Sequence, residues 1–201
     1  MIVFIEGPRE TGKTYLLESF FAKNQNPNIV YYKFAFAKYI EELGFRDQET
    51  GPGVHYFSIA NVLTILELNK TLLKDKLLVF DRSIFSAYVW SIYRNRMDRT
   101  RLINEFEKVL QSSLYEDCVL MYMTRKEEPN LKKREKDYFG NFENYEAERA
   151  VFEKVLAMSE KYDSDSSRKN YRVLFSNHFD ADSVDVFGKL LDDLARSVAS
   201  R

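Results

Sequence analysis

The segment that most constrains this chain is the loop Gly7-Pro8-Arg9-Glu10-Thr11-Gly12-Lys13-Thr14, which directly follows an apolar run from Ile2 to Ile5. It matches the pattern G-x-x-x-x-G-K-[ST] in full. Its glycines allow a tight fold in which backbone N–H groups point at phosphate oxygens, and the helix that follows adds partial positive charge. We therefore expect this loop to bind ATP, with Lys13 at the β- and γ-phosphates and the Thr14 hydroxyl on Mg²⁺.

Short apolar runs alternate with segments of helical periodicity along the rest of the chain. The predicted strands are Ile2–Ile5, Ile29–Tyr32, Leu77–Phe80, Val119–Met123 and Tyr171–Phe175. The predicted helices are Thr14–Lys23, Phe57–Leu73, Ile84–Arg94, Leu102–Leu114, Phe142–Tyr162 and Val184–Val198. Strands that are apolar on both faces, each followed by a helix, predict an α/β fold: a doubly wound five-stranded parallel sheet flanked by helices. Ligands of such a sheet bind at the carboxyl ends of its strands.

Two segments do not fit this alternation. The chain of 201 residues suits a single domain, residues 1–201, with room for small mobile insertions. Gly44 to Gly53 is polar and rich in glycine, and Lys126 to Gly140 is strongly charged. We interpret both as loops that close over substrates, the second as a cationic lid at about residues 125–141. A solvated helix face is the alternative for the charged segment.

An acidic residue ends the third predicted strand. Asp81 lies where enzymes with this phosphate loop hold Mg²⁺. Arg82 follows at once, and its planar guanidinium suits a phosphate of the acceptor, although a plain surface arginine is the alternative. Four further arginines lie between Arg94 and Arg101. They either cap two helices or hold acceptor phosphates or a nucleic-acid backbone.

Composition excludes broad classes of partner. The net charge of −1 gives no general attraction to nucleic acid or anionic membrane, so any anion site must be local. The single cysteine, Cys118, lies in an apolar run and is expected to be a buried, reduced thiol. No segment approaches a membrane span, and the N-terminal apolar run is too short for a signal peptide. We therefore expect a cytoplasmic protein.

Three groups of residues resemble a known family. Phe4-Ile5-Glu6-Gly7 with the phosphate loop resembles the opening of thymidylate kinases and deoxyribonucleoside kinases. Asp81-Arg82-Ser83 with Ser86-Ala87-Tyr88 resembles the Asp-Arg-aromatic signature of the first and the Glu-Arg-Ser signature of the second. Arg134 to Asp137, with Phe139 and Glu143, is similar to the lid and helix of thymidylate kinases. These motifs cover about a quarter of the chain.

The resemblance implies an ATP-dependent phosphotransferase acting on a (deoxy)nucleoside or nucleoside monophosphate, with ATP and Mg²⁺ as cofactors. The implied catalytic residues are Lys13, Asp81, Arg82 and Arg134, with Lys132 and Lys133 as further lid cations. Asp81 would orient Mg²⁺ or accept the proton of an acceptor hydroxyl. The adenine would lie near Asn177 and His178. The implied acceptor site contains Phe34, Arg82, Ser86 and Tyr88.

The sequence departs from the thymidylate kinase pattern at two places. The Arg-Glu-Pro-Gly-like turn after the second strand is replaced by Tyr32–Phe36, which has no arginine, and Arg9 stands where the loop usually has an acid, with Glu10 next. The acceptor is therefore left open. It is a small-molecule nucleoside or nucleotide, or a hydroxylated base such as 5-hydroxymethyluracil within DNA. A nucleotide-binding regulatory switch without an acceptor is the alternative of another class. A homodimer is also left open.

Overall fold

The computed structural model describes residues 1–9, 11–33, 51–93, 97–112, 118–125, 142–163, 171–177 and 181–199. These ranges contain a five-stranded sheet in the order β2-β3-β1-β4-β5. Its strands are β1 (Ile2–Glu6), β2 (Ile29–Lys33), β3 (Leu77–Asp81), β4 (Cys118–Arg125) and β5 (Tyr171–Asn177). Every neighbouring pair is parallel, which confirms the predicted doubly wound parallel sheet.

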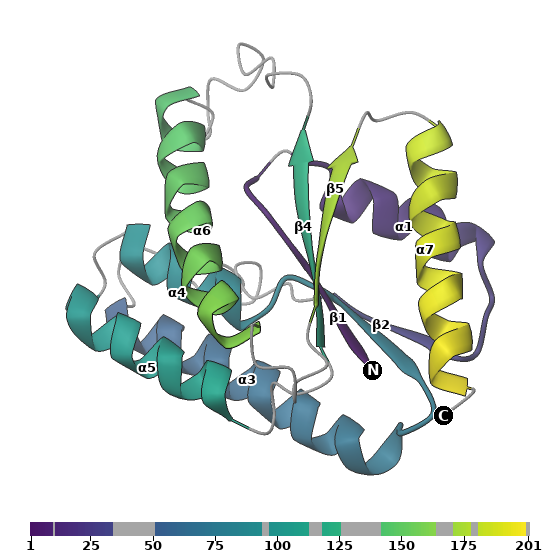
Figure 1. The fold of residues 1–201 in the computed structure, drawn as a ribbon, viewed down its shortest axis with the longest axis horizontal. Coiled ribbons are helices and arrows are strands. Elements are labelled where there is room, and N and C mark those ends of the chain that lie inside the picture. Colours follow the sequence, from purple (N-terminus) through teal and green to yellow (C-terminus); the bar gives the residue numbers. More distant parts are fainter. Residues whose placement is uncertain are drawn as a thin grey trace.

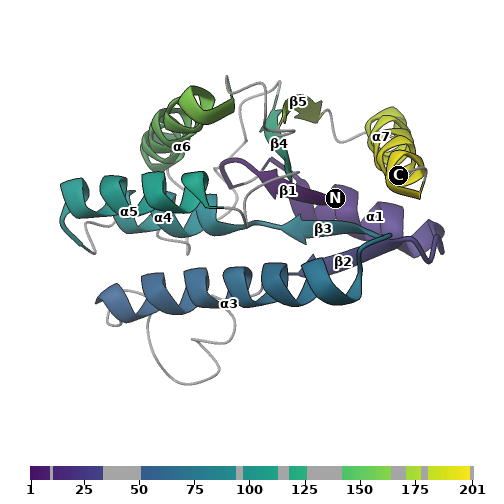
Figure 2. The ribbon, with the colours of Figure 1, turned by 60° about the horizontal axis from the view of Figure 1, so that its bottom comes forward.

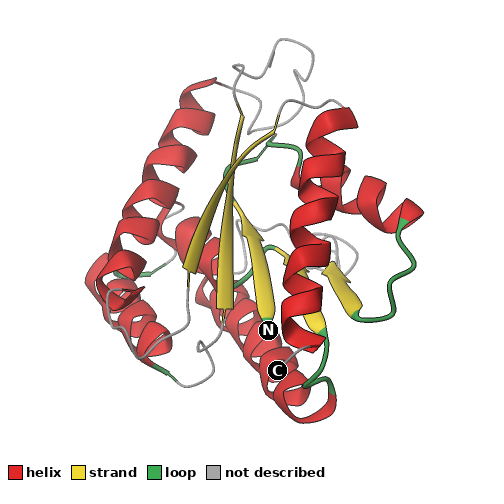
Figure 3. Cartoon of the chain, turned by 45° about the vertical axis from the view of Figure 1, so that its right-hand side comes forward, coloured by secondary structure: helices red, strands yellow, loops and turns green. Residues whose placement is uncertain are grey.

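Helices cover both faces of this sheet (Figures 1 and 3). They are α1 (Lys13–Lys23), α3 (Gly51–Leu72), α4 (Ile84–Tyr93), α5 (Arg99–Gln111), α6 (Phe142–Asp163) and α7 (Ala181–Ala199). One hydrophobic core joins the sheet to α1 and α7, and a second joins it to α3, α4, α5 and α6. Figure 2 shows α3 running below β2 and β3. Across the described ranges, no helix has the length and apolar content that a membrane span requires.

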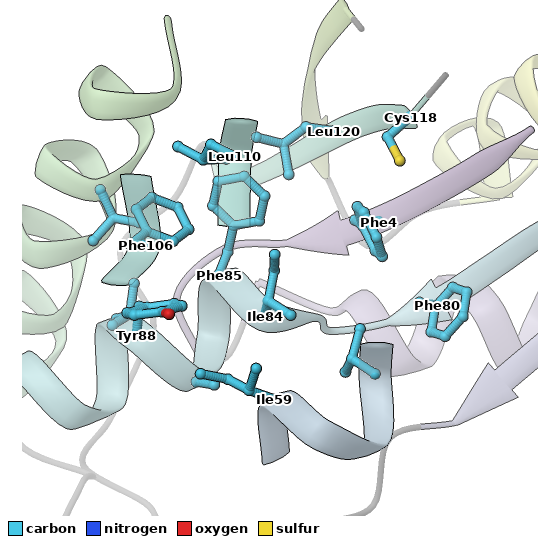
Figure 4. Close-up of a cluster of buried hydrophobic side chains, with 14 of the residues drawn as sticks. Phe4, Ile59, Phe80, Ile84, Phe85, Tyr88, Phe106, Leu110, Cys118 and Leu120 are labelled. Atoms are coloured by element: carbon cyan, nitrogen blue, oxygen red, sulfur yellow. The ribbon is translucent and has the colours of Figure 1, made fainter. Parts of the chain in front are cut away.

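The period of two along each strand decides which core a side chain enters. On β1, Phe4 packs into the core with α3 to α6, whereas Val3 and Ile5 pack into the core with α1 and α7. The core with α3 to α6 is rich in aromatic rings (Figure 4), and the centroids of Phe4 and Phe80 are 5.6 Å apart. Cys118 is 1% exposed in that core, as predicted for a buried thiol.

The same alternation decides which face of the sheet the last side chains of β1 and β3 point to. Glu6 continues the side of Phe4 and therefore faces α4, whereas Asp81 continues the side of Val79 and faces α1. Because the strands are parallel, both carboxylates lie at the carboxyl edge of the sheet, where the phosphate loop leaves β1. Glu6 and Asp81 therefore lie near the phosphate loop on opposite faces of the sheet.

Several predicted boundaries were wrong. Helix α3 begins at Gly51 rather than Phe57, so residues 51–53 are helical and not part of a loop. Glycine and proline are typical of loops, and this composition led to the loop interpretation, but proline is also compatible with the first turn of a helix. Helix α5 begins at Arg99 because the side chain of Asp98 accepts a hydrogen bond from the Arg101 backbone N–H at 2.9 Å. Residues 44–50, 94–96 and 126–141, which include the predicted lid, lie outside the described residues.

Candidate active site

Two glycines shape the phosphate loop. Gly7 has a φ of +139°, and a Cβ added to it would lie 2.3 Å from the backbone oxygen of Met123. Gly12 has a φ of 76° and forms the N-cap of α1. Both positions require a residue without a side chain, the first because the loop presses against β4 and the second because left-handed backbone strains other residues. The loop therefore opens directly into the N-terminus of α1, where partial positive charge favours anions.

Lys13 is buried and lies over this loop. Its Nζ donates hydrogen bonds to the carbonyl oxygens of Gly7 at 2.8 Å and Pro8 at 2.5 Å, and to the Thr11 hydroxyl at 3.0 Å. Burial, followed by repulsion from Arg82, lowers the pKa of Lys13 to about 7. Three carboxylates act in the opposite direction: Asp81, Glu148 and Glu6. The net effect is a pKa well below that of an ordinary lysine.

Thr14 and Asp81 form a pair of oxygen ligands beside the loop. The Thr14 hydroxyl donates to Asp81 Oδ2 at 2.9 Å across 67 residues of sequence. The pair forms because Thr14 lies in the first turn of α1 and Asp81 faces that helix. Hydroxyl and carboxylate oxygens are the ligands that Mg²⁺ prefers, so these residues fit the predicted metal. They would hold it beside the phosphates.

Arg82 is held by a buried carboxylate that the sequence did not single out as functional. Glu6 is fully buried and accepts bonds from the hydroxyls of Ser83 and Ser86, each at 2.6 Å, and from the Ser86 backbone N–H at 3.2 Å. The Ser86 hydroxyl in turn accepts from Arg82 Nη1 at 3.1 Å. Burial raises the pKa of Glu6, whereas Arg82 and the two serines lower it. The net effect is a raised pKa, and the three hydrogen bonds hold the Glu6 carboxyl group in place.

The backbone of Arg82 is also unusual. Among the described residues it is the one non-glycine residue with positive φ, at 76°. Its N–H donates to the Ile5 carbonyl at 3.1 Å, which fixes the turn from β3 into α4. A left-handed arginine costs free energy and persists where its surroundings hold it, often at functional sites. The left-handed backbone of Arg82 and the hydrogen bonds from Arg82 to Ser86 and from Ser86 to Glu6 together hold the Arg82 guanidinium beside the loop.

A third set of contacts surrounds Arg9. The Arg9 backbone N–H donates to Glu148 Oε1 at 3.2 Å, and its Nε lies 3.9 Å from Glu148 Oε2. Its guanidinium carbon lies 3.9 Å from the centroid of the Trp90 ring. Burial raises the pKa of Glu148 above its usual range, although Arg82 first and then Arg9 and Lys13 act in the opposite direction. Glu148 therefore belongs to the same charge cluster, although in the sequence it is one acid among many in a charged helix.

The structure brings together part of the predicted site. Lys13, Thr14, Asp81, Arg82 and Ser86 surround the phosphate loop, as the contacts above show. Tyr88 does not join them: it is 1% exposed and packs in the core against Phe106, with ring centroids 4.6 Å apart (Figure 4). Asn177 ends β5 at the carboxyl edge of the sheet, paired with Arg125. The other predicted residues lie outside the described ones: Glu10, Phe34, Lys132, Lys133, Arg134 and His178.

The described part of the arginine cluster has a local role. Arg101 donates from Nε to Glu105 at 2.9 Å and from Nη2 to the Tyr56 hydroxyl at 2.7 Å. Arg99 and Arg101 both lie in the first turn of α5. The contacts of Arg101 tie α5 to α3, whereas the residue that caps α5 is Asp98.

Comparison with known proteins identifies the fold. No family model matches the chain, and no curated protein sequence matches it. A solved thymidylate kinase from Candida albicans matches 98% of this chain and 91% of its own, with a TM-score of 0.60 and 16% identity. A deoxyadenosine kinase from M. mycoides, with the products dCMP and dCDP, matches 98% of this chain and 100% of its own, with a TM-score of 0.58 and 16% identity. A thymidylate kinase from Ehrlichia chaffeensis matches 96% of this chain and 97% of its own, with a TM-score of 0.52 and 16% identity. The chain therefore has the α/β fold of the thymidylate kinases and deoxyadenosine kinases, as its sequence motifs predicted.

Proposed function

We propose that this chain is an ATP-dependent phosphotransferase whose acceptor is a (deoxy)nucleoside or a nucleoside monophosphate. The observation that carries the proposal is the convergence of Lys13, the Thr14–Asp81 pair and Arg82 around the phosphate loop. Such a group serves phosphoryl transfer, in which catalysis is mostly positioning and charge stabilisation. The thymidylate and deoxyadenosine kinases that share the fold support the class of acceptor.

Each side chain has a distinct task in this proposal. Lys13 neutralises the β- and γ-phosphates, and its position over the loop supports that role. Arg82, fixed through Ser86 and Glu6, contacts the acceptor or the phosphoryl group in transfer. Arg134 would supply a further cation from the lid, and the adenine would lie near Asn177. A pre-fixed guanidinium need not reorganise when charge develops, so it stabilises the transition state efficiently.

Asp81 serves Mg²⁺ rather than the acceptor proton in our proposal. Its carboxylate accepts from Thr14 on the α1 side of the sheet. A bound Mg²⁺ would neutralise charge on the phosphates, and Thr14 and Asp81 are the oxygen donors beside them. The Asp81→Asn variant should accordingly require more Mg²⁺ for half-maximal turnover, measured by titration at saturating ATP.

The decisive experiment is an ATP-consumption assay with nucleosides, nucleoside monophosphates and short DNAs, including DNA that contains 5-hydroxymethyluracil. Lys13→Ala should lower turnover by at least about a hundredfold, because a transition-state charge contact is lost. Lys23→Ala, at the other end of α1, is the matched control and should leave turnover unchanged. A folded Lys13→Ala protein with normal turnover would contradict the proposal. Transfer confined to DNA would favour the hydroxylated base, and thermal stabilisation by ATP without turnover would favour a regulatory switch.

A further inference from the structure

Glu148 is a buried carboxylate on α6 that contacts the phosphate loop from outside the elements that form it. It is 3% exposed, and one of its oxygens accepts the backbone N–H of Arg9 at 3.2 Å. Its other oxygen lies 3.9 Å from Arg9 Nε. One carboxylate thus contacts both the backbone and the side chain of a loop residue. Burying a charge is costly unless it has partners, so the arrangement indicates a specific role.

The packing of α6 fixes the position of this carboxylate. Phe152, Val155 and Leu156 from α6 are buried in the core that also contains α4. Glu148 precedes Phe152 by four residues, so both lie on the same face of the helix. Core packing of α6 therefore fixes the Glu148 carboxylate beside the phosphate loop.

The side chain of Arg9 is held from a second direction. Its guanidinium carbon lies 3.9 Å from the centroid of Trp90, which is on α4. A cation over an indole face is attracted by the ring, and the carboxylate adds a charged partner. Arg9 is thus directed towards α4 and α6, and the loop backbone at this residue is tied to both helices.

We propose that Glu148 is a positioning residue that fixes Arg9, and through its backbone the phosphate loop, in the conformation that receives the phosphates of ATP. The effect on ATP affinity rests on the proposed function. The contact itself does not depend on that function and can be measured without nucleotide. Two measurements therefore test separately the contact between Glu148 and Arg9 and its effect on ATP affinity.

The first measurement is amide hydrogen exchange of Arg9 in the nucleotide-free protein. Glu148→Ala removes the acceptor of this N–H and should accelerate its exchange by about tenfold or more, whereas the isosteric Glu148→Gln retains an acceptor oxygen and should have a smaller effect. Glu153→Gln is the matched control, because Glu153 lies on the same helix with its side chain 54% exposed. Unchanged Arg9 exchange in a folded Glu148→Ala protein would overturn the proposal.

The second measurement is a double-mutant cycle on the Kd of Mg·ATP, with Arg9→Ala, Glu148→Ala and the double variant. Arg9→Ala removes the guanidinium and keeps the backbone N–H. If the pair positions the loop, each single change weakens binding by about five- to tenfold, and the double variant is no weaker than the weaker single variant. If the two groups act only through long-range charge, losing the cation weakens ATP binding and losing the anion strengthens it. Opposite signs, or fully additive losses, would overturn the positioning role.

The wild-type protein separates this inference from the proposed function. Failure of the wild type to bind Mg·ATP would contradict the proposed function and, with it, the role of Glu148 in nucleotide binding. Normal binding by the wild type and by all three variants would overturn the positioning role alone. Weaker binding by both single variants, with unchanged binding by Glu153→Gln, would support it.

Discussion

The titration of Lys13 leads to a measurable prediction about nucleotide binding. Burial, followed by repulsion from Arg82, lowers the pKa of Lys13 to about 7. Phosphate oxygens within hydrogen-bond distance favour the charged lysine, so binding of Mg·ATP should raise this pKa well above 8. A group whose pKa rises on binding takes up a proton wherever the free form is neutral. Mg·ATP binding should therefore be accompanied by proton uptake above pH 7 and be tightest at lower pH.

The size of the effect follows from the pKa. At pH 8, one unit above the pKa, about nine in ten nucleotide-free molecules carry a neutral Lys13, and at pH 6 about one in ten. Binding should take up about 0.9 proton at pH 8 and about 0.1 proton at pH 6. Because protonation at pH 8 costs about 1.4 kcal/mol, the Kd of Mg·ATP should rise about tenfold between these two pH values.

Isothermal titration calorimetry in two buffers of different ionisation enthalpy measures the proton uptake directly. Lys13→Arg is the matched control, because a guanidinium stays charged at both pH values. Proton uptake by the nucleotide itself is common to both proteins and cancels in the comparison. The same pH dependence in the wild type and in Lys13→Arg would refute the assignment of this titration to Lys13.

Three further predictions concern the phosphate loop, the Glu6 carboxylate that holds Arg82 through Ser86, and the hydrophobic core. Gly7→Ala should lower the free energy of unfolding in urea by about 3 kcal/mol, because its Cβ would lie 2.3 Å from the Met123 carbonyl oxygen at a φ of +139°. Gly53→Ala meets nothing within 4 Å and should be neutral or stabilising, so equal losses would contradict the steric argument. Glu6→Gln should lower the free energy of unfolding by about 2 kcal/mol in the same assay, because its amide N–H₂ would face hydroxyl donors. It should also lower turnover by about tenfold or more, because Ser86 would no longer hold Arg82 in place. Unchanged turnover would show that Glu6 does not act through Arg82. Phe106→Ala, at 1% exposure, should cost about 3–5 kcal/mol, against less than about 0.5 kcal/mol for Phe57→Ala at 56% exposure. Similar losses for the two phenylalanines would exclude the core assignment of Phe106.

Local signals in the sequence were sufficient for the sheet and the loop. Each strand is a short apolar run, and each glycine of the loop stands where the backbone needs positive φ. Helix starts were less predictable. Gly51-Pro52-Gly53 has the composition of a turn but begins α3, since packing of the following apolar face outweighs a weak local preference. Tyr88 shows the same limit, because an aromatic residue near a motif suits the core as well as a ligand pocket.

The sequence by itself indicated the phosphate loop, the fold class and the two candidate Mg²⁺ ligands, Thr14 and the strand-end acid Asp81. These features depend on residues close together in the chain or on strand periodicity, which local patterns encode. Only the tertiary structure decided that Glu6 anchors Arg82 through Ser86 and that Glu148 contacts Arg9. Those contacts join residues 80 and 139 positions apart. Glu6 ends a strand beside the loop and Glu148 is one acid among many in a charged helix, but no local pattern shows which residues each contacts, because burial and packing set those contacts.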